Sequence, residues 1–225
     1  MKSHFRIRSL WAVWLSGLLG VVAASLSAAE VLPPSKSSAP RTNATALVII
    51  DVQNFYFPGG SLPLAEPAAA SAQAAKLLER FRALGWPVVH VQHLPKNQSA
   101  PAPDSGDPQY RIHASVLPAT GEKVIGKHHA NAFRDTELLA ALREMGAGRL
   151  VIAGMQTHMC VEAATRAAAD LGFDVVVAHD ACATRALKFK DAEVSAAQVH
   201  LATLAALQGN YARVISTDEL LAELK

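Results

Sequence analysis

Short apolar runs alternate along this chain with longer segments of helical spacing, and this alternation limits the fold more than any other feature. Runs such as Ala46–Ile50, Lys123–Gly126 and Leu150–Ala153 are too short for helices and are typical of buried strands. The expected strands cover residues 46–50, 87–92, 123–126, 150–153, 174–178 and 212–215, and the expected helices cover 66–84, 135–145, 157–171, 191–207 and 217–224. The alternation predicts an α/β, Rossmann-like domain whose central, mostly parallel sheet of about six strands is covered on both faces.

Residues 1–29 have the pattern of a secretory signal peptide and are excluded from the predicted fold. A basic start at residues 2–8 is followed by the apolar stretch Leu10–Leu26 and by small residues at Ser27–Ala29, which suit a cleavage site. We therefore expect export, to the periplasm, and a mature chain that begins near Glu30. The alternative is an uncleaved anchor, because the segment Leu10–Ala29 is about 20 residues long and could just cross a bilayer.

The mature chain is expected to contain a flexible leader rich in Pro, Ser and Ala at residues 30–43 and one domain at residues 44–225. Without the three basic residues of the signal, the 21 Lys and Arg of the chain fall to 18, against 19 Asp and Glu. This balance gives no reason to expect a nucleic-acid or membrane-surface partner. We expect a small-molecule substrate and no stable membrane association after cleavage. Homo-oligomerisation is left open, although the alanine-rich segment Ala163–Ala169 would allow close helix packing.

The chain has only two cysteines, Cys160 and Cys182, although exported proteins often use disulfides. The two could be joined by a bridge or could both be buried thiols. A third interpretation is that Cys160 stays reduced because its chemistry needs a free thiol. Cys160 follows the strand that ends near Gly154, and Thr157 could cap a new helix there, which would place the sulfur in its first turn. That position predicts a lowered thiol pKa and a nucleophilic sulfur.

Two charged residues also follow apolar runs and are expected at the same edge of the sheet. Asp51 comes directly after Ala46–Ile50, and Lys127 comes directly after Val124–Gly126. Ligands of parallel sheets bind at the carboxyl ends of the strands, so these groups can meet Cys160 there. Asp51 could serve as a general base and Lys127 could stabilise a thiolate. The alternatives are a structural Asp51 and a Lys127 that merely begins a solvated loop.

The residues around these positions resemble the isochorismatase-like cysteine hydrolases. The resemblance rests on Asp51-Val52-Gln53, on Lys127 with Ala132, Phe133 and Thr136, and on Gly154, Thr157, His158, Cys160 and Val161, and it extends through Asp180–Thr184. It implies a three-layer αβα domain with an Asp51–Lys127–Cys160 catalytic triad. It also implies a cis peptide bond between Met155 and Gln156, and an oxyanion hole formed by the backbone N–H groups of Gln156 and Cys160.

The chain departs from the family pattern in the region of the metal ligands. Members that hydrolyse nicotinamide hold a divalent metal with an Asp-x-His pair and a distal His, whereas this chain has His90-Val91-Gln92-His93 and lacks the acidic ligand. Residues three apart on a strand point to opposite faces, so His90 and His93 make a poor chelate. We therefore expect neither a metal nor another cofactor. His93 is placed near the pocket as a substrate-binding residue, together with Phe57, Phe133 and Met155.

The main functional hypothesis is a cysteine-dependent hydrolase that cleaves the C–N bond of a small amide through a thioester. A second hypothesis within the family is cleavage of a vinyl ether, as in isochorismate, which needs no thiol. An exported binding domain without catalytic activity and a thiol redox protein are also open at this point. The loop Lys96–Ile112 is long for a compact domain and is expected to cover the pocket. The sequence does not identify the substrate.

Overall fold

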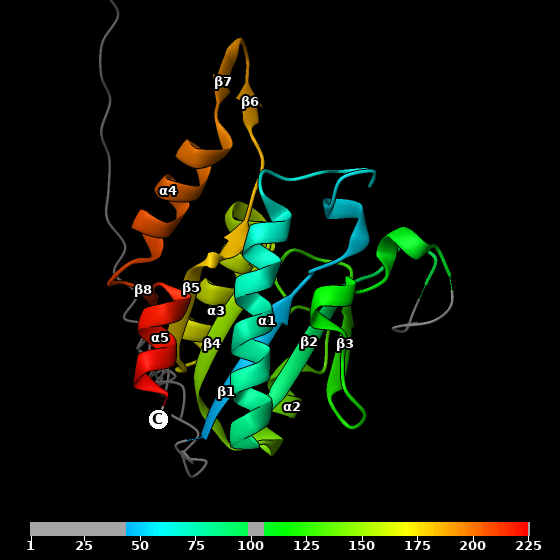
Figure 1. The fold of residues 1–225 in the computed structure, drawn as a ribbon. Coiled ribbons are helices and arrows are strands. Elements are labelled where there is room, and N and C mark those ends of the chain that lie inside the picture. Colours follow the sequence, from blue (N-terminus) through cyan, green and yellow to red (C-terminus); the bar gives the residue numbers. More distant parts are fainter. Residues whose placement is uncertain (1–43, 99–105, 225) are drawn as a thin grey trace, which may run out of the picture. The chain divides into compact units, whose positions relative to one another are not determined.

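The computed structural model describes residues 44–98 and 106–224, and its centre is a parallel sheet of six strands in the order β3-β2-β1-β4-β5-β8 (Figure 1). All five neighbouring strand pairs are parallel. The strands are β1 (Ala44–Ile50), β2 (Val88–His93), β3 (Lys123–Lys127), β4 (Ala147–Met155), β5 (Asp174–Ala183) and β8 (Arg213–Ile215). The predicted parallel α/β sheet is therefore confirmed.

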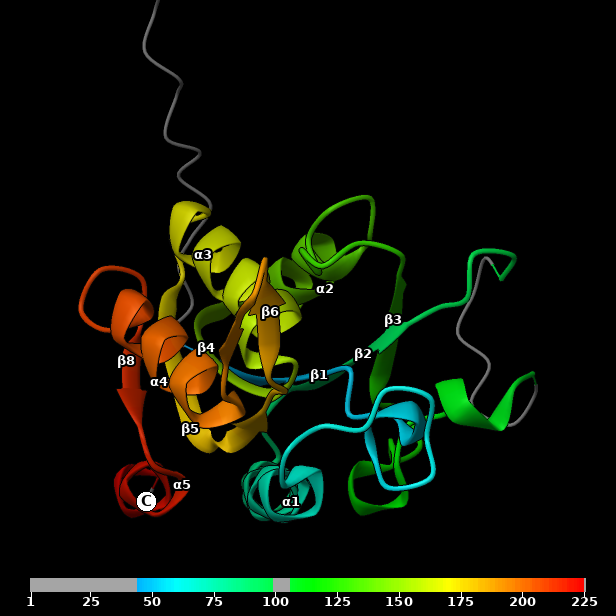
Figure 2. The ribbon, with the colours of Figure 1, turned by 90° about the horizontal axis from the view of Figure 1, so that it is seen from above.

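Helices cover both faces of this sheet, which gives the expected three layers. Seen from above in Figure 2, α1 and α5 lie on one side of the sheet, and α2 and α3 lie on the other. The helices are α1 (Pro67–Leu84), α2 (Leu138–Glu144), α3 (Glu162–Asp170), α4 (Ala196–Leu207) and α5 (Thr217–Glu223). None of the helices in the described ranges combines the length and the apolar composition needed to cross a bilayer.

The central strand β1 is apolar throughout because both of its faces are buried. Leu47 and Ile49 belong to the core beneath α1, whereas Ala46, Val48 and Ile50 belong to the core on the opposite face. A parallel strand that is covered twice has no polar face, which explains the continuous apolar run in the sequence. The run ends at the carboxyl edge of the sheet, where the polar residues begin.

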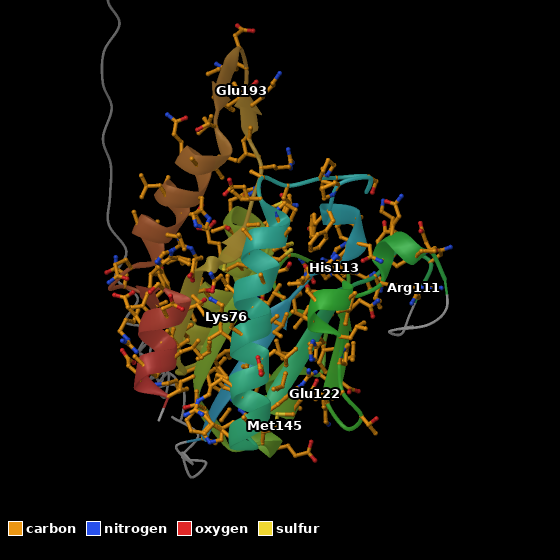
Figure 3. The ribbon with its side chains drawn as sticks, viewed as in Figure 1. Lys76, Arg111, His113, Glu122, Met145 and Glu193 are labelled. Carbon is orange, nitrogen blue, oxygen red and sulfur yellow. The ribbon has the colours of Figure 1, made fainter. Side chains whose placement is uncertain are left out.

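The predicted helix at 191–207 is wrong at its beginning. A small antiparallel hairpin of β6 (Leu187–Phe189) and β7 (Ala192–Val194) occupies this part of the chain, and α4 starts only at Ala196. The start is set by a capping box in which Ser195 and Gln198 each bond to the backbone of the other. Figure 3 shows Glu193 in this hairpin, at a distance from the sheet.

Some boundaries differ by a few residues. The helix predicted at 135–145 is shorter and begins at Leu138, while β4 and β5 are longer than predicted. The extension of β5 is possible because its register shifts, so that Gly154 pairs with Cys182 and Met155 with Ala183. This extension brings the segment that follows β5 alongside the carboxyl end of β4.

The described end of the Lys96–Ile112 loop lies against the segment that follows β1. The Asn54 N–H donates to the Arg111 carbonyl, and the Asn54 side chain donates to Pro108. A β-bridge joins Gln53 to Ile112. Residues 99–105 of the loop, the predicted signal peptide and the predicted leader lie outside the described residues, so the covering role of this loop stays a prediction.

Candidate active site at the carboxyl edge of the sheet

Asp51 is held at the end of β1 in a sharp turn of the backbone. Its φ angle of 51° is left-handed, a region that Asp tolerates better than most residues. Its N–H donates to the Val91 carbonyl at 2.9 Å, which ties the turn to β2. The side chain is fully buried, and its Oδ2 lies 2.6 Å from Lys127 Nζ. A carboxylate at this depth requires such a partner, because an unpaired buried charge is strongly unfavourable.

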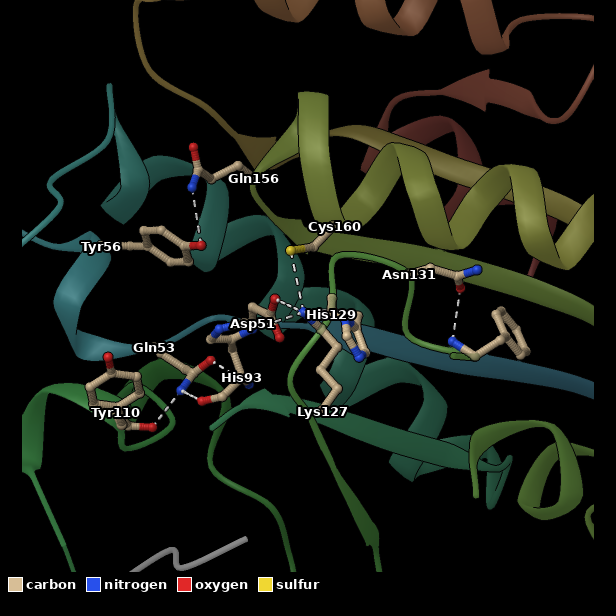
Figure 4. A network of polar contacts seen from close by, with 11 residues as sticks. Asp51, Gln53, Tyr56, His93, Tyr110, Lys127, His129, Asn131, Gln156 and Cys160 are labelled. Carbon is tan, nitrogen blue, oxygen red and sulfur yellow. Dashed lines mark hydrogen bonds and ion pairs between the residues drawn. The ribbon is translucent and has the colours of Figure 1, made fainter. Parts of the chain in front are cut away.

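Lys127 is the last residue of β3, and its ammonium joins the other two predicted site residues (Figure 4). Besides Asp51, Nζ contacts Cys160 Sγ at 3.3 Å, the His129 carbonyl at 3.0 Å and His93 Nδ1 at 3.4 Å. The structure therefore brings the carboxylate, the ammonium and the thiol into one cluster. The three residues come from the ends of β1 and β3 and from the turn after β4.

Cys160 lies in a single π-helical turn, η4 (Thr157–Val161), rather than in the first turn of an ordinary α-helix. The Val161 N–H reaches back five residues to the Gln156 carbonyl at 3.2 Å. The predicted cap is wrong, because the Thr157 hydroxyl contacts His200 Nδ1 at 3.0 Å and makes no cap. Both cysteines are free thiols, so no bridge joins Cys160 to Cys182.

The predicted lowering of the Cys160 pKa is also wrong. Burial and the Asp51 carboxylate raise the pKa of the Cys160 thiol to about 12, and Lys127 opposes them only in part. Burial lowers the pKa of Lys127, but the charges of Asp51 and Cys160 outweigh it, and the net pKa is raised. At neutral pH the site therefore holds a protonated thiol beside an ammonium, with a carboxylate within reach of both.

The peptide bond between Met155 and Gln156 is cis, as the resemblance implied. The Gln156 side chain is buried, and its Nε2 donates to the Tyr56 hydroxyl at 3.2 Å (Figure 4). Burial and the charges of Asp51 and Cys160 raise the pKa of Tyr56, so the phenol stays protonated. Sequence reasoning overlooked Tyr56, although it stands within the aromatic stretch that follows β1. The N–H groups of Gln156 and Cys160 belong to the same turn, and their oxyanion role stays a prediction.

Comparisons with known proteins agree with this geometry. The family model of the isochorismatase domain matches residues 45–219. The chain is 45% identical over 177 residues to the isochorismatase family protein YddQ of Bacillus subtilis, covering 79% of this chain and 98% of that protein. It is 34% identical over 189 residues to the secreted isochorismatase effector Isc1 of Verticillium dahliae, covering 84% and 95%. The chain belongs to the isochorismatase family.

A crystal structure from Oleispira antarctica, of a protein classed among the isochorismatase hydrolases, has the same fold. It superposes with a TM-score of 0.74 at 49% identity and covers 80% of this chain and 97% of that one. The three-layer αβα arrangement implied by the sequence is thus that of isochorismatase-family hydrolases.

Three of the residues predicted to bind substrate, Phe57, Met155 and Phe133, make different packing contacts. Phe57 stacks on the ring of His113 at a centroid distance of 3.6 Å and is buried. Met155 is fully buried directly before the cis bond. Phe133 pairs with Phe173, the residue before β5, with centroids 6.3 Å apart. Phe133 packs against the apolar cluster that also contains Cys160, and the substrate-binding roles stay predictions.

The two histidines of β2 point to different partners, as their spacing predicted. His90 Nε2 lies 2.9 Å from Glu122 Oε2, while His93 lies against Lys127. Within residues 44–98 and 106–224 no group of three His, Cys, Asp or Glu side chains is arranged to hold a metal ion. Burial lowers the pKa of both histidines, which favours neutral rings at pH 7.

Arg185 is a second residue that sequence reasoning missed. It follows β5 by two residues and is therefore next to the Met155–Gln156 end of β4. The side chain is half-buried, and its Nε is buried without a hydrogen-bond partner among the described residues. No carboxylate of the described part of the chain lies within ion-pair distance of this guanidinium. The sequence signal that could have identified Arg185 is a single arginine shortly after the end of a predicted strand.

A cavity of about 560 Å³ lies beside the site, between α1, β5 and α4, and none of Asp51, Lys127 and Cys160 lines it. Its polar lining includes His179, Asp180 and His200. Asp180 accepts hydrogen bonds from the N–H and the hydroxyl of Thr217 at 2.7 and 2.8 Å, contacts that fit a structural role. The chemical cluster and this cavity are thus separate features.

Proposed function

We propose that this isochorismatase-family hydrolase cleaves the C–N bond of a small amide, with Cys160 as nucleophile, Asp51 as general base and acid, and Lys127 as the stabilising cation. The observation that carries the proposal is the contact of Lys127 Nζ with both Asp51 Oδ2, at 2.6 Å, and Cys160 Sγ, at 3.3 Å, in a buried site. A nucleophile, a base and a cation at hydrogen-bond distances are the requirements of covalent acyl transfer.

In the first half-reaction, the Asp51 carboxylate takes the thiol proton while the Cys160 sulfur forms a bond to the substrate carbonyl carbon. The carbonyl electrons move to oxygen, which the N–H groups of Gln156 and Cys160 would stabilise. The tetrahedral intermediate then expels the amine as Asp51 returns the proton to nitrogen. The product that remains is a thioester on Cys160.

In the second half-reaction, Asp51 takes a proton from water, whose oxygen attacks the thioester carbonyl. The C–S bond breaks, and the sulfur leaves as a thiolate beside Lys127 and then regains its proton from Asp51. The raised pKa of Cys160, about 12, fits this cycle because the thiol is neutral at rest. The proton therefore leaves sulfur only when a substrate carbonyl is in place to share the charge.

Two hydrolases among the relatives support this class of reaction, and the name of the first states an amide substrate. Maleamate amidohydrolase of Pseudomonas putida is 28% identical over 194 residues, and streptothricin hydrolase of Streptomyces noursei is 37% identical over 139 residues. Arg185 adds a substrate preference, because a half-buried guanidinium without a carboxylate partner suits an anionic ligand. We therefore infer that the acyl part of the amide carries a carboxylate.

The experiment is a panel of small amides, with and without a carboxylate on the acyl part, assayed by ammonia release. Acid-quenched reactions are examined by peptide mass spectrometry for an acyl group on Cys160. The proposal expects ammonia and an acylated Cys160 in the wild type and in Cys182→Ala, and neither in Cys160→Ala. Equal turnover by Cys160→Ala would refute it. Vinyl ether cleavage without an acyl-enzyme would support the second family chemistry instead.

We also propose that the protein is exported after removal of residues 1–29. The support is the basic, apolar and small-residue order of that segment. Cell fractionation with N-terminal sequencing tests this: a periplasmic protein that begins near Glu30 is expected, whereas a membrane-bound protein with an intact start would contradict cleavage.

A further inference from the structure

Gln53 is a buried side chain whose hydrogen bonds all go to the backbone of two other segments. Its Oε1 accepts from the His93 N–H at 2.8 Å, and its Nε2 donates to the His93 carbonyl at 3.0 Å. The same Nε2 also donates to the Tyr110 carbonyl at 2.5 Å (Figure 4). One carboxamide thus holds both main-chain polar groups of His93, much as a neighbouring strand would.

This clamp matters because His93 is the last residue of β2, where a strand would otherwise fray. Its register partner on β3 is Lys127, and its Nδ1 lies 3.4 Å from Lys127 Nζ. The imidazole is half-buried. Fixing the backbone of His93 therefore also fixes the distance between the ring and the ammonium.

An ammonium has three protons, and Lys127 Nζ has four neighbouring acceptors: Asp51 Oδ2, the His129 carbonyl, Cys160 Sγ and His93 Nδ1. A ring nitrogen that faces an ammonium must offer its lone pair, so the His93 ring must be neutral with its proton on Nε2. The four acceptors surround Nζ and limit how far it can move. Removal of the His93 acceptor would let the ammonium shift toward Asp51, its oppositely charged neighbour at 2.6 Å, and away from Cys160 Sγ.

The charges around His93 agree with a neutral ring. Burial lowers its pKa most; Lys127 on β3 and His128 and His129 in the following loop lower it further, and only Asp51 at the end of β1 raises it. A proton on the ring would place two positive charges 3.4 Å apart, where they repel each other strongly because the site is partly buried.

We propose that Gln53 and His93 are positioning residues that hold the Lys127 ammonium between Asp51 and Cys160, and that protonation of His93 switches this arrangement off at acid pH. The inference rests on the proposed function, since it assigns the role of Lys127. It predicts that the acid limb of activity belongs to His93 rather than to a substrate group.

The test uses His93→Ala and His93→Asn, together with the rate at which iodoacetamide alkylates Cys160 between pH 6 and pH 11. Asparagine offers an acceptor near the place of Nδ1 but does not titrate. We expect alkylation at pH 8 to slow by about tenfold in His93→Ala, which corresponds to one unit of thiol pKa. In His93→Asn the rate should stay within about twofold of the wild type.

Two patterns of alkylation rate would contradict the proposed role of His93. Equal rates in the wild type and both variants, or equal slowing in both variants, would overturn it, because an inert or merely structural histidine gives those patterns. On an amide substrate, kcat/KM of the wild type should fall at acid pH, whereas His93→Asn should lose that inflection. Persistence of the inflection in His93→Asn would overturn the switch.

Two further variants complete the design. Gln53→Glu removes the donor to the His93 and Tyr110 carbonyls and should slow alkylation as His93→Ala does; if it does not fold, as judged by circular dichroism, the His93 pair decides alone. His90→Asn, on the opposite face of β2, is the matched control and should leave the alkylation profile unchanged. Alkylation needs no substrate, so it tests the positioning of Lys127 independently of the amide panel. If no amide in the panel is cleaved, the proposed function is refuted, but the alkylation rates still show whether His93 positions Lys127.

Discussion

Two carboxylates of this protein, Glu122 and Asp51, each face a cation and a histidine of β2, but they are bound very differently. Both oxygens of Glu122 are committed: Oε1 contacts Arg82 at 2.7 Å, and Oε2 contacts His90 at 2.9 Å and the Ala119 N–H at 2.8 Å. Asp51 pairs with Lys127 through Oδ2, while its Oδ1 is buried without a hydrogen-bond partner among the described residues.

This is the difference expected between a structural carboxylate and one that serves as a general base, the role proposed for Asp51. Figure 3 shows Glu122 at the lower part of the sheet, away from the carboxyl edge that carries the candidate site. A saturated carboxylate has no lone pair free for a proton, whereas the open oxygen of Asp51 can take one from a neighbouring thiol. Unsatisfied buried acceptors are rare in folded proteins, so one beside a cysteine points to chemistry.

The largest effect should come from Lys127→Met, which removes the cation from the reactive cluster. We expect kcat/KM on a cleaved amide to fall by about 10³-fold or more, and stability to fall by about 3–5 kcal/mol because Asp51 is left buried and unpaired. Urea unfolding and steady-state kinetics measure the two effects. A variant with normal stability would mean that the Asp51–Lys127 pair contributes little to the fold.

The reactivity of Cys160 should show the raised pKa of its thiol. With a pKa of about 12, the thiolate fraction is small at neutral pH and grows about tenfold per pH unit up to that value. Iodoacetamide labelling of the free enzyme should therefore be slow at pH 7 and should still increase between pH 9 and pH 11. A labelling rate that levels off below pH 8 would contradict this and restore the activated thiol predicted from the sequence.

Substitution of Glu122, the structural carboxylate, should lower stability and leave activity unchanged. Glu122→Gln loses the ion pair with Arg82 and weakens the bond to His90, so we expect a loss of about 2–3 kcal/mol in the free energy of unfolding with kcat/KM within about twofold. Chemical denaturation and the amide assay measure these. A large fall in kcat/KM without a loss of stability would mean that the contacts of Glu122 also affect the geometry of the candidate site.

The same carboxylate gives a pH dependence with a fixed sign. Burial alone would raise the pKa of Glu122, but bonds from Arg82, Ala119 and His90 outweigh it and hold the pKa at about 2, below the ordinary 4.5. The unfolded chain therefore binds its proton first. The stabilisation is fully present above pH 4.5 and is lost as the pH falls from 4.5 toward 2. Glu122→Gln should lack this loss, and an identical acid transition in both proteins would contradict the assignment.

The smallest effect is expected from Lys123→Met, which removes a lysine from the same strand as Lys127. Lys123 contacts Glu144 at 3.1 Å, but both side chains are largely exposed to solvent. Exposed pairs contribute about 0.5 kcal/mol or less, so stability and activity should both stay near wild type. This variant is the matched control for Lys127→Met. A loss above about 1 kcal/mol in the free energy of unfolding would show that the Lys123–Glu144 pair stabilises the fold more than exposed pairs usually do.

Much of the site followed from the order of strands in the sequence. Asp51 and Lys127 end or follow apolar strands, and parallel strands present their ends at one edge, so their meeting with Cys160 was predictable without coordinates. What could not be predicted depends on side-chain direction and burial. The direction of Phe133 toward Phe173 is one case, and the contact of Gln53 with the backbone of His93 is another.

The Cys160 pKa was mispredicted because the local pattern was considered alone. A position at the start of a helix suggested stabilisation of a thiolate, whereas the structure adds burial and a carboxylate, which act in the opposite direction and dominate. The hairpin before α4 was missed for a similar reason. Its strands are three residues long, and only the capping box at Ser195 marks where the helix begins.

Gly154 has a consequence for how this enzyme can change by mutation. Its φ of +131° is one that L-amino acids rarely adopt, and a Cβ there would lie 2.0 Å from the Ile50 carbonyl oxygen, one residue before Asp51. Any other amino acid would push β4 away from β1 and carry the sulfur of residue 160 away from the carboxylate. A saturation library at this codon should therefore yield glycine as the sole active variant, however tolerant the surrounding strands prove to be.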